Sequence, residues 1–279
     1  MKLSWRNYSF DFSQRTYIMG ILNVTPDSFS DGGSYLHKDV AVERALAMER
    51  DGADIIDVGG ESTRPGAEKV SVKEEIQRVV PVIEEITKRV RVPVSIDTYK
   101  AAVAEAAVSA GATMINDIRG PWFDPLMPSI AASHKIPLVI MHIKGTPENM
   151  QKNPVYKSLI PEIMDYLREG IDIAVQAGIP DDRIILDPGI GFGKRVEHNL
   201  EIIQRLNEFE GFEKPILLGH SRKSFIGRVL DDLPVMDRLE GTAAAAAIGI
   251  FNGANIIRVH DVKEMVRVAR VADAIRRGY

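Results

Sequence analysis

Short apolar runs alternate with amphipathic stretches along most of the chain. The run at residues 17–22 ends on Asn23, a loop rich in Pro, Ser, Asp and Gly follows, and helical periodicity begins near Asp39. Seven further units repeat this order. The predicted strands are residues 17–22, 55–58, 94–96, 114–115, 137–141, 184–186, 215–218 and 255–258. The predicted helices are residues 39–50, 72–90, 100–110, 128–134, 156–177, 197–209, 237–252 and 261–276.

Eight consecutive strand-then-helix units predict an α/β fold, a single (β/α)8 TIM barrel domain over residues 1–279. Its parallel strands would be buried on both faces. Residues 1–15 alternate apolar and polar side chains, which predicts a short N-terminal hairpin before the barrel. A doubly wound open sheet is the alternative fold, but it usually has fewer units and one glycine-rich phosphate loop.

Composition narrows the range of functions. The formal net charge of −4 argues against a general nucleic-acid binder, which needs a basic surface. The chain has no cysteine, and this excludes disulfides, thiolate catalysis and cysteine-ligated metals. No apolar stretch has the length of a signal peptide or of a membrane span, so we expect a cytoplasmic protein that does not enter a membrane.

Polar residues stand at the carboxyl end of every predicted strand. In a barrel these ends meet at one face, where catalytic groups come from the strand-to-helix loops. Any one of these residues could serve only as a helix cap, but polar residues at all the matching positions predict a shared site. They are Asn23, Asp57 with residues 61–64, Asp97, Asn116 and Asp117, His142, Asp187, residues 219–224, and Arg258 with His260.

The predicted site divides into two chemical groups. An anion-binding set consists of Arg64, Lys223, Arg258 and His260. Asp97, Asn116 and Asp187 offer carboxylate and amide groups to a flat heterocycle with N–H donors, such as a guanine or a pterin. We therefore expect a nitrogenous ring deep in the barrel mouth and phosphate near its rim. Barrel geometry alone puts that phosphate at the helix start around residues 221–224.

Other features are assigned simpler roles. The segment 187–194 lacks the Gly-x-x-x-x-Gly-Lys-Ser/Thr spacing of a phosphate loop, so its glycines are expected to let backbone approach a planar ligand. No two histidines have the spacing of a HExxH zinc site. The loops 24–36 and 59–71 are predicted to order around substrate. The alanines at 243–247 are predicted to pack against either the barrel or a second subunit.

Several of these segments together resemble one enzyme family. Asn-Val-Thr-Pro-Asp-Ser-Phe-Ser-Asp-Gly-Gly at 23–33 and Asp-Val-Gly-Gly-Glu-Ser-Thr-Arg-Pro-Gly-Ala at 57–67 resemble two signature segments of the bacterial dihydropteroate synthases. These are the pterin-binding barrel enzymes that sulfonamides target. Further matches occur, in family order, at residues 95–98, 116–117, 187–194, 221–224 and 258–260. The resemblance covers essentially the whole chain.

The resemblance implies a reaction and the residues that support it. The family condenses 6-hydroxymethyl-7,8-dihydropterin diphosphate with p-aminobenzoate in folate biosynthesis, giving 7,8-dihydropteroate and pyrophosphate with the help of Mg2+. Implied pterin contacts are Asp97, Asn116, Ile118, Met141, Asp187, Phe192, Lys223 and Arg258. Implied diphosphate contacts are Arg64, Arg258, His260 and Asn23, of which Asn23 would also meet the magnesium ion. Implied p-aminobenzoate contacts are Phe29, Thr63, Pro65, Lys223 and Ser224.

The resemblance also assigns catalysis and changes one expectation. Catalytic contributions are implied for Asn23, Arg64, Asp97, Lys223, Arg258 and His260. The family places the carboxylate of p-aminobenzoate, and not a phosphate, at the helix start near Ser224, and we adopt that assignment. It further implies a homodimer joined through helices on one side of the barrel.

Two other functions compete with the synthase. A methyltransferase that acts on methyltetrahydrofolate with a corrinoid protein could share the ring-binding residues, but it has no need for the anion-binding set. A pterin-binding homologue without catalysis would keep the ring site, and the sequence alone does not exclude it. For the synthase we predict that the carbon–oxygen bond ionises before the amine attacks, because the electron-rich ring can delocalise the cation.

Overall fold

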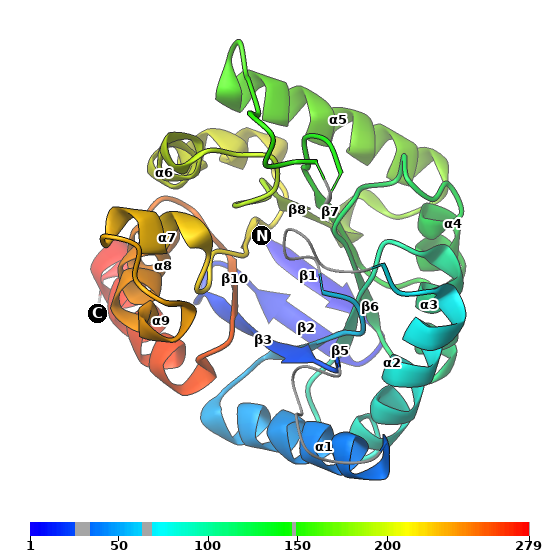
Figure 1. The fold of residues 1–279 in the computed structure, drawn as a ribbon. Helices are drawn as coiled ribbons and strands as arrows, with labels where there is room; N and C mark the ends of the chain where they lie inside the picture. Colours follow the sequence, from blue (N-terminus) through cyan, green and yellow to red (C-terminus); the bar gives the residue numbers. More distant parts are fainter. Residues whose placement is uncertain (26–33, 63–68, 147–148, 279) are drawn as a thin grey trace.

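The barrel is a closed parallel sheet. The computed structural model describes residues 1–25, 34–62, 69–146 and 149–278, and within them eight strands pair in the order β8-β7-β6-β5-β4-β3-β10-β9 (Figure 1). A parallel bridge between Leu186 and Ile216 joins β8 to the entry of β9 and closes the sheet. The strands are β3 (Tyr17–Asn23), β4 (Ile55–Gly59), β5 (Val94–Asp97), β6 (Met114–Asp117), β7 (Leu138–Met141), β8 (Ile184–Asp187), β9 (Leu217–Leu218) and β10 (Ile256–Val259).

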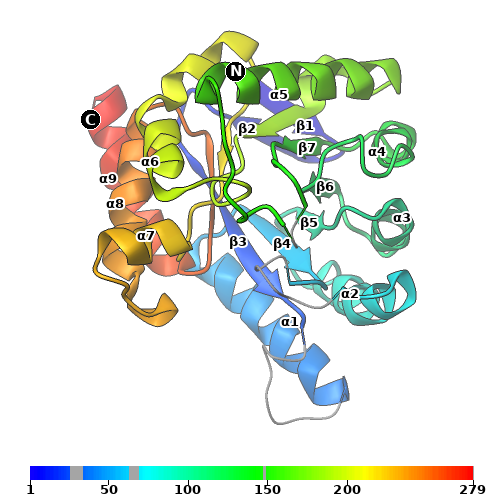
Figure 2. The ribbon, with the colours of Figure 1, turned by 45° about the horizontal axis from the view of Figure 1, so that its top comes forward.

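Helices surround the strands in a ring (Figures 1 and 2). One α-helix follows each described barrel strand, except that α7 and α8 both lie between β9 and β10. The described α-helices are α1 (Ser34–Asp51), α2 (Val72–Ile86), α3 (Ala101–Ser109), α4 (Met127–His134), α5 (Leu159–Gln176), α6 (Val196–Gln204), α7 (Ser224–Val229), α8 (Leu239–Phe251) and α9 (Val262–Arg277). The predicted (β/α)8 barrel is therefore confirmed.

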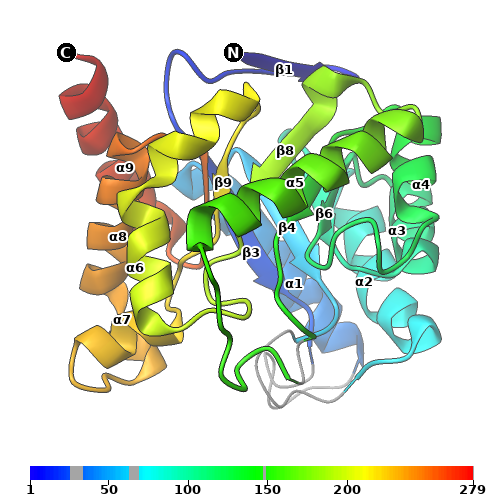
Figure 3. The ribbon, with the colours of Figure 1, turned by 90° about the horizontal axis from the view of Figure 1, so that it is seen from above.

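The predicted hairpin is also present. β1 (Lys2–Trp5) pairs with β2 (Tyr8–Asp11) in antiparallel fashion, and the pair lies across one end of the barrel (Figure 3). The ring of Phe10 stacks on that of Tyr17, the first residue of β3, with 4.3 Å between the centroids. The hairpin thus covers the end where the strands begin and leaves the opposite end to the functional groups.

Most strands extend one or two residues beyond their predicted ends. Asn23, Asp97, Asp117 and Asp187 are each the last residue of a strand. A polar side chain does not interrupt a strand, because the backbone groups make the pairing. The polar residues of the site are therefore held by the sheet itself, on a rigid element.

Helix boundaries differ more from the predictions. The helix predicted at 197–209 is divided, because α6 ends at Gln204 and a 3-10 helix covers Leu206–Phe212. The sequence predicts a helix start near residues 221–224, but α7 has only six residues, too few to produce a periodic pattern. α8 buries Ala246 in the core and leaves Ala244 exposed, so the alanine run does pack against the barrel. Among the described helices, none is long and apolar enough to cross a membrane.

Candidate active site

The centre of the site is a buried ionic network that joins four strands of the barrel. Asp57 of β4 is completely buried, and its Oδ2 accepts hydrogen bonds from Asn116 Nδ2 at 2.9 Å and from Arg258 Nε at 2.6 Å. Arg258 of β10 also donates from Nη2 to Asp97 Oδ2 of β5 at 2.5 Å. One guanidinium thus bridges two carboxylates and holds both in fixed positions.

The network shifts the pKa values of its members in opposite directions. Burial alone would lower the pKa of Arg258, but the carboxylates of Asp97 and Asp57 raise it above its ordinary value. Burial raises the pKa of Asp97 to about 7, against the opposing effect of Arg258. A buried carboxyl group whose pKa is raised in this way is a candidate functional residue.

A second polar group comes from β8 and the loop before α7. The carboxylate of Asp187 is buried, and its Oδ1 accepts the backbone N–H of Gly189 at 2.7 Å. Lys223 donates from Nζ to Ile190 O at 2.6 Å, and the same nitrogen lies 3.9 Å from the centroid of the Phe192 ring. Burial lowers the pKa of Lys223 to about 7, although Asp187 acts in the opposite direction. Burial raises the pKa of Asp187.

A hydrophobic cluster forms one wall of the site. Three predicted pterin contacts, Ile118, Met141 and Phe192, lie in the same small cluster of buried side chains. That cluster is separate from the main core and also contains Tyr99, Ile143 and Met150. A flat apolar wall beside fixed hydrogen-bonding groups is typical of a site for a planar heterocycle. The last three residues could not be identified from the sequence, because isolated Tyr, Ile and Met positions carry no motif.

His260 lies beside the loop that carries Lys223. Its Nδ1 is 3.0 Å from Ser221 Oγ, and the Ser221 oxygen accepts the backbone N–H of His260 at 3.2 Å. Burial lowers the pKa of His260 to about 3, with a further contribution from Arg258, so the imidazole is neutral near pH 7. A hydroxyl hydrogen directed at Nδ1 would leave the Nε2–H free to donate to an anion.

Asn23, the predicted magnesium contact, is the last residue of β3. Asn23 Oδ1 and Asp97 Oδ2 lie 3.7 Å and 3.5 Å from the position that a Cβ atom on Gly59 would take. The part of the chain that the structure describes holds no group of three His, Cys, Asp or Glu side chains able to bind a metal. Mg2+ commonly takes most of its ligands from water and substrate phosphates, so the single amide oxygen of Asn23 fits such a site.

The glycines of the segment 187–194 are required by contacts within the protein. Gly189, Gly191 and Gly193 all have positive φ angles, between 65° and 82°. A Cβ atom on Gly189 would lie 1.9 Å from His142 O, and one on Gly191 would lie 2.7 Å from Lys223 Cδ. These contacts already explain the glycines, and the approach of a planar ligand to their backbone stays a prediction.

A buried lysine–histidine pair lies behind this turn and is not marked by any motif in the sequence. Lys194 and His142 are both buried, and Lys194 Nζ lies 2.8 Å from His142 Nδ1 and 3.0 Å from Phe192 O. Burial lowers the pKa of both groups well below their ordinary values. These contacts hold the turn that contains Phe192 in place. A single lysine in the sequence does not indicate this role.

Asp57 has contacts that its place at a strand end did not predict. From the sequence it is only one of the polar strand-end residues. A polar residue inside an otherwise apolar strand is the signal that could have identified it, because a buried carboxylate requires partners.

Some predicted residues lie outside the described part of the chain. These are Phe29, Thr63, Arg64 and Pro65, together with residues 26–33 and 63–68 of the two loops predicted to order around substrate. Ser224 is exposed at the first position of α7, as expected for a residue at a helix start. Within the described residues, the structure brings Asp97, Asn116 and Arg258 into one network and Asp187, Lys223 and Phe192 into its neighbour.

Comparisons with known proteins identify this arrangement. Residues 19–260 match the family model of the pterin binding enzymes. The chain is 53% identical over 267 residues to dihydropteroate synthase of Bacillus subtilis, and the match covers 96% of this chain and 91% of the relative. The structure of Yersinia pestis dihydropteroate synthase with a sulfonamide drug complex has a TM-score of 0.93 and 46% identity, and covers 99% of both chains.

A further relative was solved with a pterin compound. Dihydropteroate synthase from Clostridium difficile, in the presence of pteroic acid, has a TM-score of 0.91 and 48% identity, and covers 96% of this chain and 99% of its own. The chain belongs to the pterin-binding enzyme family and, within it, to the dihydropteroate synthases, the transferases of folate synthesis.

Proposed function

We propose that this synthase joins 6-hydroxymethyl-7,8-dihydropterin diphosphate to p-aminobenzoate, and that the buried Asp57–Arg258–Asp97 network with Asn116 forms the base of its pterin site. The observation that carries the proposal is this network, next to the wall of Ile118, Met141 and Phe192. A relative solved in the presence of pteroic acid supports the substrates, because that molecule contains both the pterin and the aminobenzoate parts.

The pterin ring is proposed to use the polar groups in complementary ways. Carboxylates accept hydrogen bonds, so Asp97 and Asp187 suit the N–H donors of the aminopyrimidine edge. The Asn116 amide can donate as well as accept, and the Lys223 ammonium donates to a ring oxygen or nitrogen. Arg258 is assigned to the ring face, with Met141, Ile118 and Phe192 on the apolar side.

The diphosphate is proposed to lie nearer the rim, between Asn23 and His260. Asn23 would hold Mg2+ together with the diphosphate, and the ion would supply positive charge that stabilises pyrophosphate as a leaving group. The neutral imidazole of His260 would donate one hydrogen bond to a phosphate oxygen. Arg64 and Arg258 are assigned to the same anion, and the aminobenzoate to Phe29, Thr63, Pro65, Lys223 and Ser224.

Chemistry is proposed to begin with ionisation. The bond between the methylene carbon and the diphosphate oxygen breaks, its electron pair leaves with pyrophosphate, and the cation is delocalised into the dihydropterin ring. Asp97 and Asp187 are placed to stabilise that positive charge. The lone pair of the aryl amine then forms the carbon–nitrogen bond, and the extra amine proton is lost. A strong base is unnecessary, because an aryl amine is unprotonated at neutral pH.

We also propose that two copies associate through one side of the barrel. A groove of about 470 Å3 lies between α6, α7 and α8, and its apolar lining includes Leu200, Phe225, Val229 and Ile248. Apolar side chains that gather on an exposed surface often mark a protein interface. This groove supports the second-subunit alternative for the exposed face of the alanine run.

The test is an assay with magnesium, dihydropterin diphosphate and p-aminobenzoate that measures pyrophosphate and dihydropteroate together. Equal amounts of the two products are expected. Pyrophosphate alone would mean that ionisation occurs at a site with a different amine partner. Tight pterin binding with neither product would favour the non-catalytic homologue. Positional isotope exchange in the diphosphate, without the amine, tests ionisation first, and its absence would contradict that step.

A further inference from the structure

A cavity of about 490 Å3 lies at the end of the barrel opposite the candidate active site. It is bounded by the turn of the N-terminal hairpin, by the ends of α2 and α3 and by the starts of β5 and β6. The hairpin lies across this end of the barrel (Figure 3). Val94, the first residue of β5, lines the cavity, whereas Asp97 at the other end of the same strand belongs to the active site. A ligand in this hairpin cavity would therefore be separate from both substrates.

The lining of the hairpin cavity carries positive charge. Arg6 from the hairpin turn and Arg91 from the segment between α2 and β5 both line it, and among the described residues no aspartate or glutamate does. Asn7 and Tyr8 add an amide and a hydroxyl group. Guanidinium, amide and hydroxyl groups all donate hydrogen bonds, so the lining suits a ligand that is rich in acceptors.

The protein does not neutralise either of these two arginines. Within the described part of the chain, the guanidinium groups of Arg6 and Arg91 make no hydrogen bond and no ion pair. The nearest carboxylate contact is to backbone, because Glu49 Oε1 accepts the N–H groups of Arg91 at 2.6 Å and of Val92 at 3.3 Å. Both guanidinium groups are therefore available to an anion.

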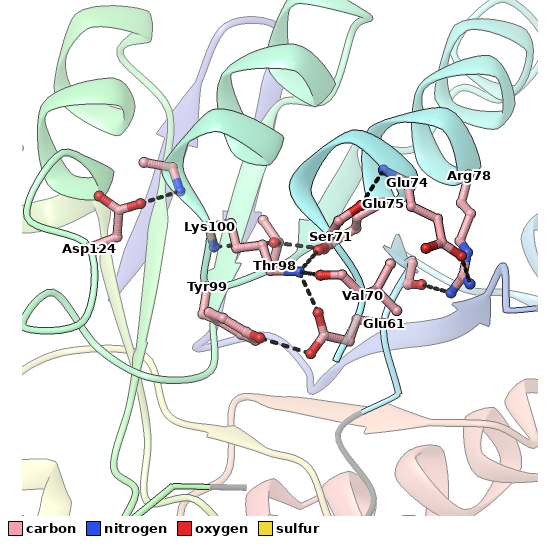
Figure 4. A network of polar contacts seen from close by, with 12 residues as sticks. Glu61, Val70, Ser71, Glu74, Glu75, Arg78, Thr98, Tyr99, Lys100 and Asp124 are labelled. Atoms are coloured by element: carbon pink, nitrogen blue, oxygen red, sulfur yellow. Dashed lines mark hydrogen bonds and ion pairs between the residues drawn. The ribbon is translucent and has the colours of Figure 1, made fainter. Parts of the chain in front are cut away.

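Other cations on the neighbouring elements are paired. Lys100 has three acceptors, of which two are carboxylates, and Arg78 of α2 has a carboxylate acceptor as well (Figure 4). Arg89, only two residues before Arg91, donates from Nη2 to Glu43 Oε1 at 3.0 Å. The lack of a partner thus distinguishes the two arginines of the cavity from cations nearby.

Two helices end at this cavity, and helix C-termini attract cations rather than anions. Their last carbonyl groups already have donors. Ile86 O of α2 accepts the N–H groups of Arg89 and Val90 at 2.9 and 2.8 Å, and Val108 O of α3 accepts that of Gly111 at 3.0 Å. Each helix end amounts to about half a negative charge, so the two full charges of the arginines prevail.

A buried hydroxyl group beside the cavity lacks a partner as well. Thr113 lines the cavity and is only 6% exposed, and within the described residues its Oγ1 has no hydrogen-bond partner. A buried polar atom without a partner raises the free energy of the folded state. A polar ligand in the cavity, or a water molecule that it orders, would supply the missing partner.

We propose that the hairpin cavity is a second binding site, for a small molecule that carries two negative charges on phosphate or carboxylate oxygens. Arg6 and Arg91 would bind the charged oxygens, and the Asn7 amide would donate a further hydrogen bond. A cavity of this volume has room for an organic molecule as well as for a single ion. The inference uses no assignment made in the active site.

Methyl NMR with labelled valines tests the site directly. Inorganic phosphate and succinate serve as probes, at low salt and about pH 8, where phosphate carries two charges. The methyl signals of Val90, Val92 and Val94, which all line the cavity, should shift to saturation with a Kd on the order of 1 mM. Val259, next to His260, reports separately on anions that bind at the proposed diphosphate site.

Arg6→Met and Arg91→Met each remove one of the two charges. Both arginines are exposed, so the variants should fold, and each should raise the Kd of the probes about tenfold. Arg89→Met is the matched control, because it removes a charge two positions away that does not line the cavity. Its Kd should stay within about twofold of the wild type.

The two probes also identify the group that the site selects. Saturable shifts with only one probe would assign the site to phosphate or to carboxylate, and shifts with both would mean that it recognises charge; each result supports the inference. Absence of saturable shifts at the three valines would overturn it, as would shifts confined to Val259. Equal weakening by Arg91→Met and Arg89→Met would also overturn it, because general surface charge would then account for binding.

Discussion

Several residues of this site fix one another's positions through hydrogen bonds and ion pairs. Asp57 touches both Asn116 and Arg258, and its second oxygen, Oδ1, is buried without a hydrogen-bond partner. Because the carboxylate is completely buried, its orientation cannot be maintained by water. The directions of the Asn116 amide and the Arg258 guanidinium therefore depend on a residue that need not touch the substrate.

Asp57→Asn should weaken pterin binding while the protein still folds. The amide keeps the shape but removes the charge that holds Arg258, and loss of a charged hydrogen bond costs roughly 1.5–3 kcal/mol. The Kd for dihydropterin diphosphate, measured by calorimetry, should rise about tenfold or more. Asp165→Asn, on the exposed face of α5, is the control. An unchanged Kd in Asp57→Asn would show that Asn116 and Arg258 orient themselves without it.

Activity should have a bell-shaped dependence on pH with a maximum near pH 7. Below this pH, protonation of Asp97, whose pKa burial raises to about 7, removes the charge that stabilises the pterin cation. Above this pH, Lys223 loses its proton, because burial lowers its pKa to about 7. The two groups interact, so the observed values belong to the pair. The measurement is kcat/KM for the pterin diphosphate between about pH 5 and 9.

Lys223→Arg identifies the basic limb of that profile. A guanidinium keeps its charge at every pH in the assay, so the decrease on the basic side should move upward or disappear. Its larger, planar head should also lower the maximum rate. A basic limb that stays in place would assign it to another group.

Among the elements, the β8-to-α6 connection is the one most constrained by backbone geometry. Gly189 has a φ of +72°, and its neighbours leave no space for a side chain. The turn carries Phe192, which stands beside Lys223, and Gln151 Nε2 donates to Gly191 O at 2.7 Å from across the site. A change in this turn would therefore move an aromatic wall residue and a lysine together.

Gly189→Ala should destabilise the protein by at least about 1–3 kcal/mol, because alanine is strained at positive φ and its Cβ would collide with backbone. The closest atom, His142 O, lies 1.9 Å from the ideal Cβ position. Urea denaturation measures the difference in unfolding free energy. Gly211→Ala is the control, since a Cβ there meets nothing within 4 Å. Equal stabilities of the two variants would mean that the turn rearranges without cost.

The sequence predicts elements better than contacts. Parallel strands buried on both faces appear as apolar runs, so the barrel strands could be found, and barrel topology brings their ends together. The pairing of Asp57 with Arg258, 201 residues apart, depends on strand register and on side-chain conformation, and neither is visible in a sequence pattern. The same holds for Lys100, whose three acceptors lie 25 to 39 residues before it. Its sequence position alone predicts a helix start.

At the scale of the whole molecule, one buried carboxyl group makes the folding stability depend on pH. Asp117 at the end of β6 is buried, and burial raises its pKa to about 7, although the backbone N–H of Arg119 at 3.0 Å acts against this. The folded protein therefore binds a proton between about pH 4 and 7 that the unfolded chain releases. The stability linked to this proton is present below pH 4 and is lost as the pH rises toward 7.

Asp117→Asn should remove this decrease of folding stability with rising pH. An amide oxygen can still accept the Arg119 N–H, and it carries no charge to bury. Relative to the wild type, the variant should gain on the order of 2–4 kcal/mol of unfolding free energy between about pH 4.5 and 8. Denaturation at both pH values measures the change. The surface variant Asp165→Asn should stay within about 0.5 kcal/mol of the wild type. If the unfolding free energies of Asp117→Asn and the wild type differ by the same amount at both pH values, Asp117 does not titrate in this range.

At the largest scale, the helices on one side of the barrel leave apolar side chains uncovered. Ile248 on α8 lines the groove between α6, α7 and α8 and is 53% exposed. Ile275 on α9 is 69% exposed but is not part of that groove. The two isoleucines are both exposed and lie on neighbouring helices, but only Ile248 lies in the proposed interface.

Ile248→Arg should therefore convert the proposed dimer into a monomer, because a buried unpaired charge at an interface costs several kcal/mol. Sedimentation velocity should give the mass of a dimer for the wild type and of a monomer for the variant. Ile275→Arg adds the same charge outside the groove and should leave the dimer intact. A wild type that sediments as a monomer, or an Ile248→Arg variant that remains dimeric, would rule out this groove as the contact between subunits. Dissociation by both variants would instead extend the interface to α9.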